Sequence, residues 1–374
     1  MKRTLIVATT SYAGMGPYVS EIVNNFSNKD DIYYFFRDNE DNFFRKNIKK
    51  ELRSKSYFYK RKNSKLNKII ELLPIKQPYF STILKLCCKY NIQVVHFING
   101  PESRNLISSL EKKGITSIST IHDLHPHESK KKWYKELRSS ILNKRLKENL
   151  NYIKNVITNS QSQFKEIISL FPKKKVFFHS FPTLVTEIIK CGNENSEELK
   201  NLNKPYILFF GRIEEYKGIG ILYKTFVENS CLNKNFYLVI AGKGTLSFKR
   251  ENNELNVIFI NRYINDSEIA NMYKNAACVV YPYISATQSG VLSLAFYFKV
   301  PILASDVSFF KDNIVPKENG LLFKNGDCND LRDKLLYILN SDNCSMTTNG
   351  KEYYNRNYNG KAIREKLIEI YNHT

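Results

Sequence analysis

Short runs of β-branched and aromatic residues alternate with amphipathic segments along the first half of the chain. These runs predict buried strands that begin at Thr4, Val94, Ser117, Asn155 and Lys175. Strands that alternate with helical patterns are typical of parallel α/β units. We therefore expect a parallel sheet in the first half.

The same alternation restarts in the second half, after a polar stretch from Cys191 to Lys204 that we interpret as an interdomain linker. Helices are predicted over residues 218–228, 266–275 and 289–298. The predicted strands begin at Tyr206, Phe236, Asn256, Cys278, Val300 and Gly320. This half is therefore expected to form a second α/β domain.

The last segment of the chain is amphipathic, because Ile363, Leu367 and Ile370 recur at helical spacing. A terminal helix is expected there. It either crosses back to the first domain or caps the second one, and the spacing alone does not choose between these arrangements.

Length and composition agree with two globular domains. A chain of 374 residues is long enough for about two, and its hydrophobic fraction of 42% is ordinary. No run of about 18 apolar residues is present to span a bilayer, and the short apolar stretch at Thr4 predicts no secretion signal. The seven cysteines show no C-x-x-C pair, which argues against a disulfide framework or a zinc site and favours a reducing cytosol.

The formal net charge of +21 favours a polyanionic partner. Cations crowd the stretch from Arg45 to Lys76, where aromatic residues lie between them, and a second basic run from Lys130 to Lys147 surrounds Trp133. Basic and aromatic residues together suit an anionic membrane surface. Nucleic-acid stacking and a plain solvated face remain alternatives for the same residues.

Two cations flank a predicted strand-to-helix turn in the second half. Arg212 follows the strand that begins at Tyr206, and Lys217 precedes the next helix, with Gly211 and Gly218 beside them. Helix N-termini bind phosphates at the carboxyl ends of parallel strands, and glycines let the backbone come close. The pattern predicts a diphosphate cradle, although an ordinary solvated pair of cations fits the spacing equally well.

Two further stretches follow strands in the same half. "AGKGT", which contains Gly242, lacks the third glycine of a dinucleotide fingerprint, so an NAD site is disfavoured. A small and polar turn then precedes the helix at 289–298, where free N–H groups can hold hydroxyls or phosphate oxygens. The turn residues that we expect to bind a ligand are Thr287, Gln288, Ser289 and Gly290.

These three stretches, in this order, resemble the C-terminal domain of the GT-B glycosyltransferases of family 4, the glycosyl transferases group 1. The family's G-R-x-x-x-x-K-G pattern is matched by Gly211, Arg212, Lys217 and Gly218, and its later strand by residues 301–305. The resemblance implies that Arg212 and Lys217 hold the diphosphate of a nucleotide sugar. Gly211 and Gly242 would lie at the donor as well.

The first half is similar to the family at two places. Gly14 and Gly16 lie in a glycine-rich first loop, which in the family lies near the donor cleft. His122 follows a strand and precedes Asp123, as does the family histidine that reaches the transferred sugar. A lone histidine at a strand end is often structural, but this position favours a catalytic role. His125 is interpreted as a surface residue.

One departure from the family concerns two glutamates that normally face the donor sugar and the ribose. Their positions fall at Ala286 and Leu294 here, so both carboxylates are absent. The resemblance implies that Thr287 and Gln288 take over the sugar contacts. The departure also keeps open a noncatalytic GT-B partner subunit. No D-x-D motif is present, and we expect no essential metal and no other cofactor.

The sequence is therefore identified as a member of the GT-B glycosyltransferases, with two Rossmann-like α/β domains that face a cleft. The expected domains are an acceptor domain (1–185), a nucleotide-sugar domain (200–355) and a helix that crosses back (356–374). The resemblance implies retaining hexose transfer from a nucleotide diphosphate sugar to a saccharide on a polyprenyl diphosphate lipid, in O-antigen or capsule biosynthesis. We expect a cytoplasmic protein at the inner face of the membrane; a nucleic-acid-binding protein remains the alternative outside this class.

Overall fold

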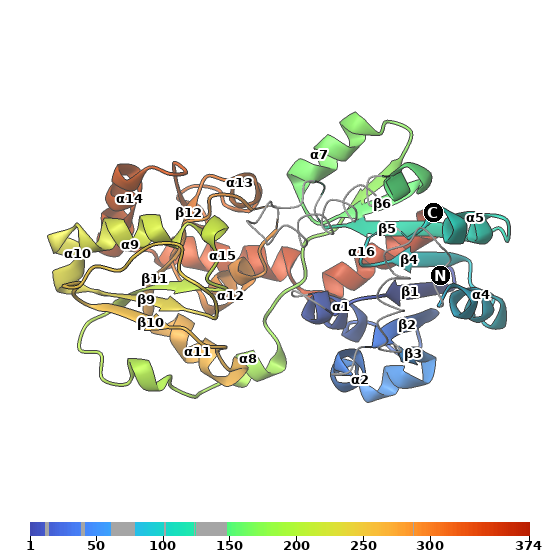
Figure 1. Ribbon diagram of the computed structural model, residues 1–374, viewed down its shortest axis with the longest axis horizontal. Helices are drawn as coiled ribbons and strands as arrows, with labels where there is room; N and C mark the ends of the chain where they lie inside the picture. The colour runs from blue at the N-terminus through green and yellow to red at the C-terminus, as the bar shows by residue number, and fades with distance from the viewer. Residues whose placement is uncertain are drawn as a thin grey trace. The chain divides into compact units, whose positions relative to one another are not determined.

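The computed structural model describes residues 1–11, 15–38, 42–60, 79–100, 102–122, 124, 148–286 and 288–374. Contacts divide the chain into two compact units, drawn in Figure 1. The first unit contains Met1–Pro182 together with Gly360–Thr374, and the second contains Thr183–Asn359. The two units are described separately below.

The first unit contains a seven-stranded sheet with the order β3-β2-β1-β4-β5-β6-β7, in which all paired strands are parallel. The strands are β1 (Thr4–Ala8), β2 (Ile32–Asp38), β3 (Ser56–Lys60), β4 (Val94–Phe97), β5 (Thr116–Ile121), β6 (Asn155–Thr158) and β7 (Lys175–Phe178). The helices are α1 (Met15–Asn24), α2 (Phe43–Asn47), the 3-10 helix η1 (Lys50–Lys55), α4 (Phe80–Lys89), α5 (Arg104–Glu111), α7 (Gln161–Leu170) and α16 (Gly360–His373).

Alternate residues of each strand enter the two hydrophobic cores on opposite faces of this sheet. Leu5 and Val7 of β1 lie in one core, whereas Ile6 and Ala8 lie in the other. Because both faces are covered, every residue of β1 is buried, as is usual for central parallel strands. This burial explains why the runs of β-branched residues were visible in the sequence.

The C-terminal helix α16 is part of the first unit, as the sequence analysis expected (Figure 1). Its apolar side chains join the same core as Ile6. Inside this core the ring of His96 bonds to Tyr371 Oη of α16 at 2.8 Å and to Thr120 Oγ1 of β5 at 2.7 Å. Burial lowers the pKa of His96 to about 3, so the neutral ring ties helix to sheet.

The second unit contains a six-stranded parallel sheet with the order β10-β9-β8-β11-β12-β13. Its strands are β8 (Tyr206–Phe210), β9 (Tyr237–Ala241), β10 (Val257–Ile260), β11 (Ala276–Tyr281), β12 (Ile302–Ser305) and β13 (Leu321–Phe323). The α-helices are α8 (Glu187–Cys191), α9 (Ile219–Val227), α10 (Ser230–Asn235), α11 (Asp266–Lys274), α12 (Val291–Phe298), α13 (Ser308–Asn313), α14 (Cys328–Asn340) and α15 (Cys344–Asn357). Two 3-10 helices, η2 (Glu197–Leu199) and η3 (Glu215–Lys217), complete the unit.

None of the helices in the described parts of the chain is both long and apolar enough to cross a bilayer.

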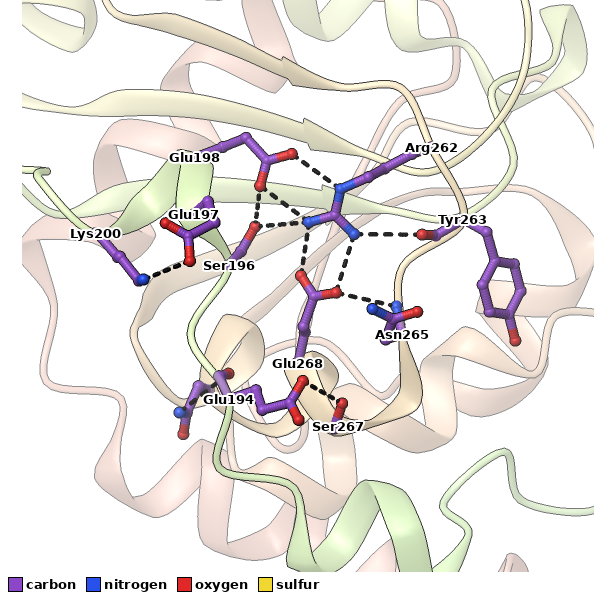
Figure 2. Close-up of polar contacts among 11 residues, drawn as sticks. Glu194, Ser196, Glu197, Glu198, Lys200, Arg262, Tyr263, Asn265, Ser267 and Glu268 are labelled. Carbon is purple, nitrogen blue, oxygen red and sulfur yellow. Dashed lines mark hydrogen bonds and ion pairs between the residues drawn. The ribbon is translucent and has the colours of Figure 1, made fainter.

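The polar stretch that the sequence analysis interpreted as a linker is instead a folded part of the second unit. Figure 2 shows Arg262 between two carboxylates: its Nε lies 2.9 Å from Glu198 Oε1 and its Nη2 lies 2.7 Å from Glu268 Oε2. The Ser196 hydroxyl accepts a further bond from Arg262. The linker prediction was wrong because these polar side chains pair with the region around α11 rather than with water.

The ion pairs around Arg262 shift the pKa of both carboxyl groups. Hydrogen bonding to Arg262 lowers the pKa of Glu198 to about 2 and also lowers the pKa of Glu268. A carboxyl group whose folded pKa is depressed stabilises the fold above its unfolded pKa of 4.5, and this contribution disappears as the pH falls towards the folded pKa.

We predict that Arg262→Leu lowers the free energy of unfolding by about 2 kcal/mol at neutral pH, because the buried carboxylate of Glu268 loses its partner. The difference from the wild type should shrink as the pH falls from about 4.5 to about 2. Urea denaturation at several pH values measures both effects. Arg332→Leu is the control, since its pair with Asp333 is exposed and should contribute less than about 1 kcal/mol. Equal effects of the two variants would contradict a stabilising role for the ion pairs of Arg262.

Candidate functional site

Glycines bring two loops together at the carboxyl edge of the second sheet. Gly211 follows β8 with φ 142°, and Gly242 follows β9 with φ 146°. A Cβ atom on Gly242 would lie 1.9 Å from the carbonyl oxygen of Gly211, which no side chain could accept. The N–H of Ile213 donates to the carbonyl of Lys243 at 3.1 Å, so the two loops also pair. Close backbone contact therefore requires a glycine at position 242, whereas position 211 favours glycine because of its positive φ.

A third close approach places the turn before α9 against the segment after β11. Gly218 has φ 64°, and a Cβ atom there would lie 1.8 Å from the carbonyl oxygen of Pro282. The N–H of Ile284 donates to the carbonyl of Tyr216 at 2.8 Å. Lys217 immediately precedes Gly218, so this contact places the lysine next to the residues after β11 that lead into the polar turn.

Lys217 is buried, with only 8% of the residue exposed. Its Nζ lies 3.7 Å from the centre of the Tyr283 ring and 4.8 Å from the centre of the Tyr216 ring. Burial, together with the nearby cation of Arg212, lowers the pKa of Lys217 to about 7. The lysine is therefore not the solvated loop cation that the sequence left open as an alternative.

Arg212 lies close enough to Lys217 to lower its pKa, but its own side chain is 59% exposed. The Nη1 atom lies 2.9 Å from Glu214 Oε1. The two cations predicted from the sequence thus share one edge of one sheet, one buried and one accessible. Together with the N-terminal end of α9, they can bind an anionic group.

The polar turn before α12 contributes two of its predicted residues to the same neighbourhood. Ser289 is buried, and its Oγ lies 3.3 Å from Tyr283 Oη. Gly290 immediately precedes α12, where a Cβ atom would lie 2.7 Å from Leu184 Cγ, so packing alone explains a glycine there. Gln288 is described as part of the turn, whereas Thr287 lies outside the described residues.

The two positions where the family carries glutamates are apolar and buried. Ala286 lies in the turn and Leu294 lies on α12, and both belong to the hydrophobic core of the second unit. Neither position presents a polar group. Any sugar contact in this region would have to come from other residues.

In the first unit, His122 directly follows β5, and its Nε2 lies 2.8 Å from the carbonyl oxygen of Ile98. Because a carbonyl only accepts, Nε2 carries the proton in this bond. Gln163 of α7 fixes the backbone on both sides of residue 123: its amide donates to the His122 carbonyl at 3.0 Å and accepts from the Leu124 N–H at 2.8 Å. The ring edge of Tyr18 packs on His122 with ring centres 4.7 Å apart.

Two other predictions in the first unit are less informative. Gly16 lies on α1, where a Cβ atom would come within 2.5 Å of the Phe43 ring, so the glycine has a packing reason. Gly14, Asp123 and His125 lie outside the described residues.

Sequence reasoning missed Gln163, Tyr216 and Tyr283, which surround the predicted site residues. The sequence analysis did not single out these three residues. The S-Q-S-Q run at residues 160–163 offered a signal, since Ser160 caps α7 and places Gln163 in its first turn. Within the described ranges, no three His, Cys, Asp or Glu side chains are grouped so that they could hold a metal ion.

Residues 193–358 match the model of a protein family described as "Glycosyl transferases group 1". An alignment over 197 residues is 24% identical to the capsular polysaccharide biosynthesis glycosyltransferase CapM of Staphylococcus aureus and covers 50% of this chain and 51% of the relative. An alignment over 205 residues is 26% identical to the uncharacterized glycosyltransferase MJ1178 of Methanocaldococcus jannaschii and covers 47% of this chain and 57% of the relative. The chain thus spans about half the length of these curated relatives.

Solved structures are similar over the whole chain. Sucrose-phosphate synthase from Thermosynechococcus elongatus gives a TM-score of 0.70 at 17% identity, with 100% of this chain and 99% of that chain covered. Anabaena Alr3699/HepE, solved in complex with UDP, gives 0.69 at 12% identity, with both chains fully covered. At such identities the likeness concerns the fold, and it confirms the expected GT-B fold with two Rossmann-like domains.

We predict that Lys217 releases its proton near pH 7 in the folded protein, because burial and Arg212 disfavour its charged form. NMR spectroscopy of protein labelled with 13C at lysine Cε can follow this titration, and the resonance that disappears in Lys217→Met identifies the residue. Lys351, whose pKa is lowered to about 8 by burial, provides a second shifted signal for comparison. A Lys217 resonance that titrates near the ordinary value of 10.5 would contradict the buried site.

Proposed function

We propose that this chain, whose second unit carries a glycosyl transferases group 1 domain within a GT-B fold, transfers a hexose from a nucleotide diphosphate sugar to a saccharide acceptor. The observation that carries the proposal is the pair of cations beside the N-terminal end of α9. The names of the glycosyltransferases that match parts of the chain support the activity. The UDP complex of a structure with the same fold supports the donor class.

The two cations would act on the leaving group. As the bond between the sugar and the diphosphate breaks, negative charge grows on the diphosphate, and fixed cations stabilise that charge more strongly than water does. Arg212 supplies a full charge, Lys217 supplies one when it is protonated, and the free N–H groups of α9 add a partial positive charge. In this proposal the side chains supply the charge that a divalent ion would otherwise bring, so no essential metal or other cofactor is required.

We assign a contact with the transferred sugar to His122 and, in the second unit, to the polar turn at Gln288 and Ser289. The position of His122 directly after β5 and the resemblance to the family support its assignment. Gly14, Gly16, Gly211, Gly242, Thr287 and Gly290 keep their proposed places around the donor. As the resemblance to family 4 implies, we propose that the anomeric configuration is retained.

The proposed acceptor is a growing saccharide on a polyprenyl diphosphate lipid, in capsule or O-antigen biosynthesis. A capsular polysaccharide glycosyltransferase among the relatives supports the polysaccharide pathway. The first unit supports a membrane location, because the segment from α2 to β3 exposes a set of cations. We call this set the basic face; it consists of Arg45, Lys46, Lys49, Lys50, Arg53 and Lys60.

Docking of the basic face on anionic lipid would place the protein at the inner face of the cell membrane. A cation near an anionic bilayer contributes about 1 kcal/mol. We expect no nucleic-acid partner. A noncatalytic partner subunit of the same fold remains the second candidate, because apolar residues occupy both family glutamate positions, 286 and 294.

We predict that Arg212→Ala and Lys217→Ala each lower kcat/KM by at least about a hundredfold, because each removes a charge that faces the leaving diphosphate. Initial rates with a nucleotide diphosphate sugar measure this loss, and circular dichroism checks the fold. Lys224→Ala is the matched control, since this lysine is exposed on α9 and should leave the rate within about twofold. Turnover close to that of the wild type in both site variants would remove the two cations from the mechanism.

We predict that more of the wild-type protein sediments with liposomes as their content of anionic lipid rises. Less should sediment as the salt concentration rises, because salt screens exposed charges, over about 8 Å at physiological ionic strength. Replacing Lys46, Lys49, Lys50 and Arg53 by glutamate should abolish this binding while activity on a short water-soluble acceptor persists. The control replaces four exposed lysines of the second unit by glutamate: Lys224, Lys234, Lys317 and Lys324. If the first variant still sediments, or if both variants lose binding equally, the basic face is not the docking surface.

A further inference from the structure

Lys217 is held by aromatic rings rather than by a carboxylate. Its Nζ lies 3.7 Å from the centre of the Tyr283 ring and 4.8 Å from that of Tyr216, both inside the range of about 6 Å in which cations and aromatic faces attract. Among the described residues, no carboxylate forms an ion pair with this ammonium group. Glu214, whose charge acts on Lys217 from the same turn, forms an ion pair with Arg212.

Tyr283 is itself fixed from several sides. It is fully buried, its backbone carbonyl accepts a bond from Ser305 Oγ at 2.6 Å, and its ring packs against Phe310 with ring centres 5.1 Å apart. The hydroxyl group lies 3.3 Å from Ser289 Oγ, just before α12. One side chain therefore touches both the lysine before α9 and the serine before α12.

The choice of an aromatic partner has an electrostatic consequence. A carboxylate within ion-pair distance would neutralise Lys217 and compete with an incoming anion. An aromatic face attracts the ammonium group through its quadrupole but carries no net charge, so it can orient the cation without cancelling it. This arrangement suits a group whose positive charge, when present, is left available to a ligand.

We propose that Tyr283 is a positioning residue for the donor site: its ring, with that of Tyr216, aims Lys217 at the donor diphosphate, while its hydroxyl group holds Ser289. The inference rests on the proposed function, because it takes Lys217 as a diphosphate ligand. Tyr283 would also link the turn before α9 to the turn before α12. This link does not require the glutamates that are absent at positions 286 and 294.

The test measures binding of UDP and of inorganic pyrophosphate by isothermal titration calorimetry. Tyr283→Phe keeps the ring and should retain pyrophosphate affinity within about threefold, whereas Tyr283→Leu removes it and should weaken binding roughly tenfold. In a Lys217→Met background, Tyr283→Leu should change affinity by less than about twofold, because the ring acts through the lysine. Tyr216→Leu removes the second ring, which is less buried. It should weaken binding when Lys217 is present but not in the Lys217→Met background, and it replaces Tyr283→Leu if that variant does not fold.

The outcomes separate this inference from the proposed function. If Lys217→Met weakens binding but the ring-deletion variants bind like the wild type, the rings do not position the lysine. The same conclusion follows if Tyr283→Phe loses as much as Tyr283→Leu, or if ring deletion weakens binding equally without the lysine. If the wild-type protein binds neither UDP nor pyrophosphate, the proposed donor site fails, and the inference fails with it.

Discussion

Close backbone contact at the carboxyl edge of the second sheet is the constraint on which the candidate site depends. The loop after β9 touches the loop after β8 at Gly242, and the turn before α9 touches the segment after β11 at Gly218. Any side chain at either glycine would collide with a carbonyl oxygen. Because these turns meet, residues from two separate strand ends surround one ammonium group.

Burying the ammonium group of Lys217 costs folding free energy, which suggests that the lysine is kept for a function. Burial disfavours the charged form, as the pKa near 7 shows, and folding alone would favour an apolar residue there. Between the folded pKa of about 7 and the ordinary 10.5, the unfolded chain binds this proton more tightly, so the protein becomes more stable as the pH rises through that window. A cation kept at such a cost, beside a second cation and a helix N-terminus, is typical of a site for an anionic ligand.

Most of the fold could be read from the sequence, because parallel strands buried on both faces give continuous apolar runs. Arg212 and Lys217 could also be found, since their spacing around a strand-to-helix turn is local. Tyr283 could not, because its contact with Lys217 joins segments 66 positions apart and requires the tertiary contact at Gly218. The folded stretch around Glu198 was mistaken for a linker for the same reason: its partner, Arg262, lies far away in the chain.

The central claim is that Arg212 and Lys217 bind the diphosphate of the donor. A crystal structure of the protein with a bound nucleotide diphosphate addresses this claim most directly. Our account predicts diphosphate oxygens at hydrogen-bond distance, about 2.7–3.2 Å, from the guanidinium group of Arg212 and from Nζ of Lys217. A nucleotide bound elsewhere, with both cations free of phosphate contacts, would contradict the account.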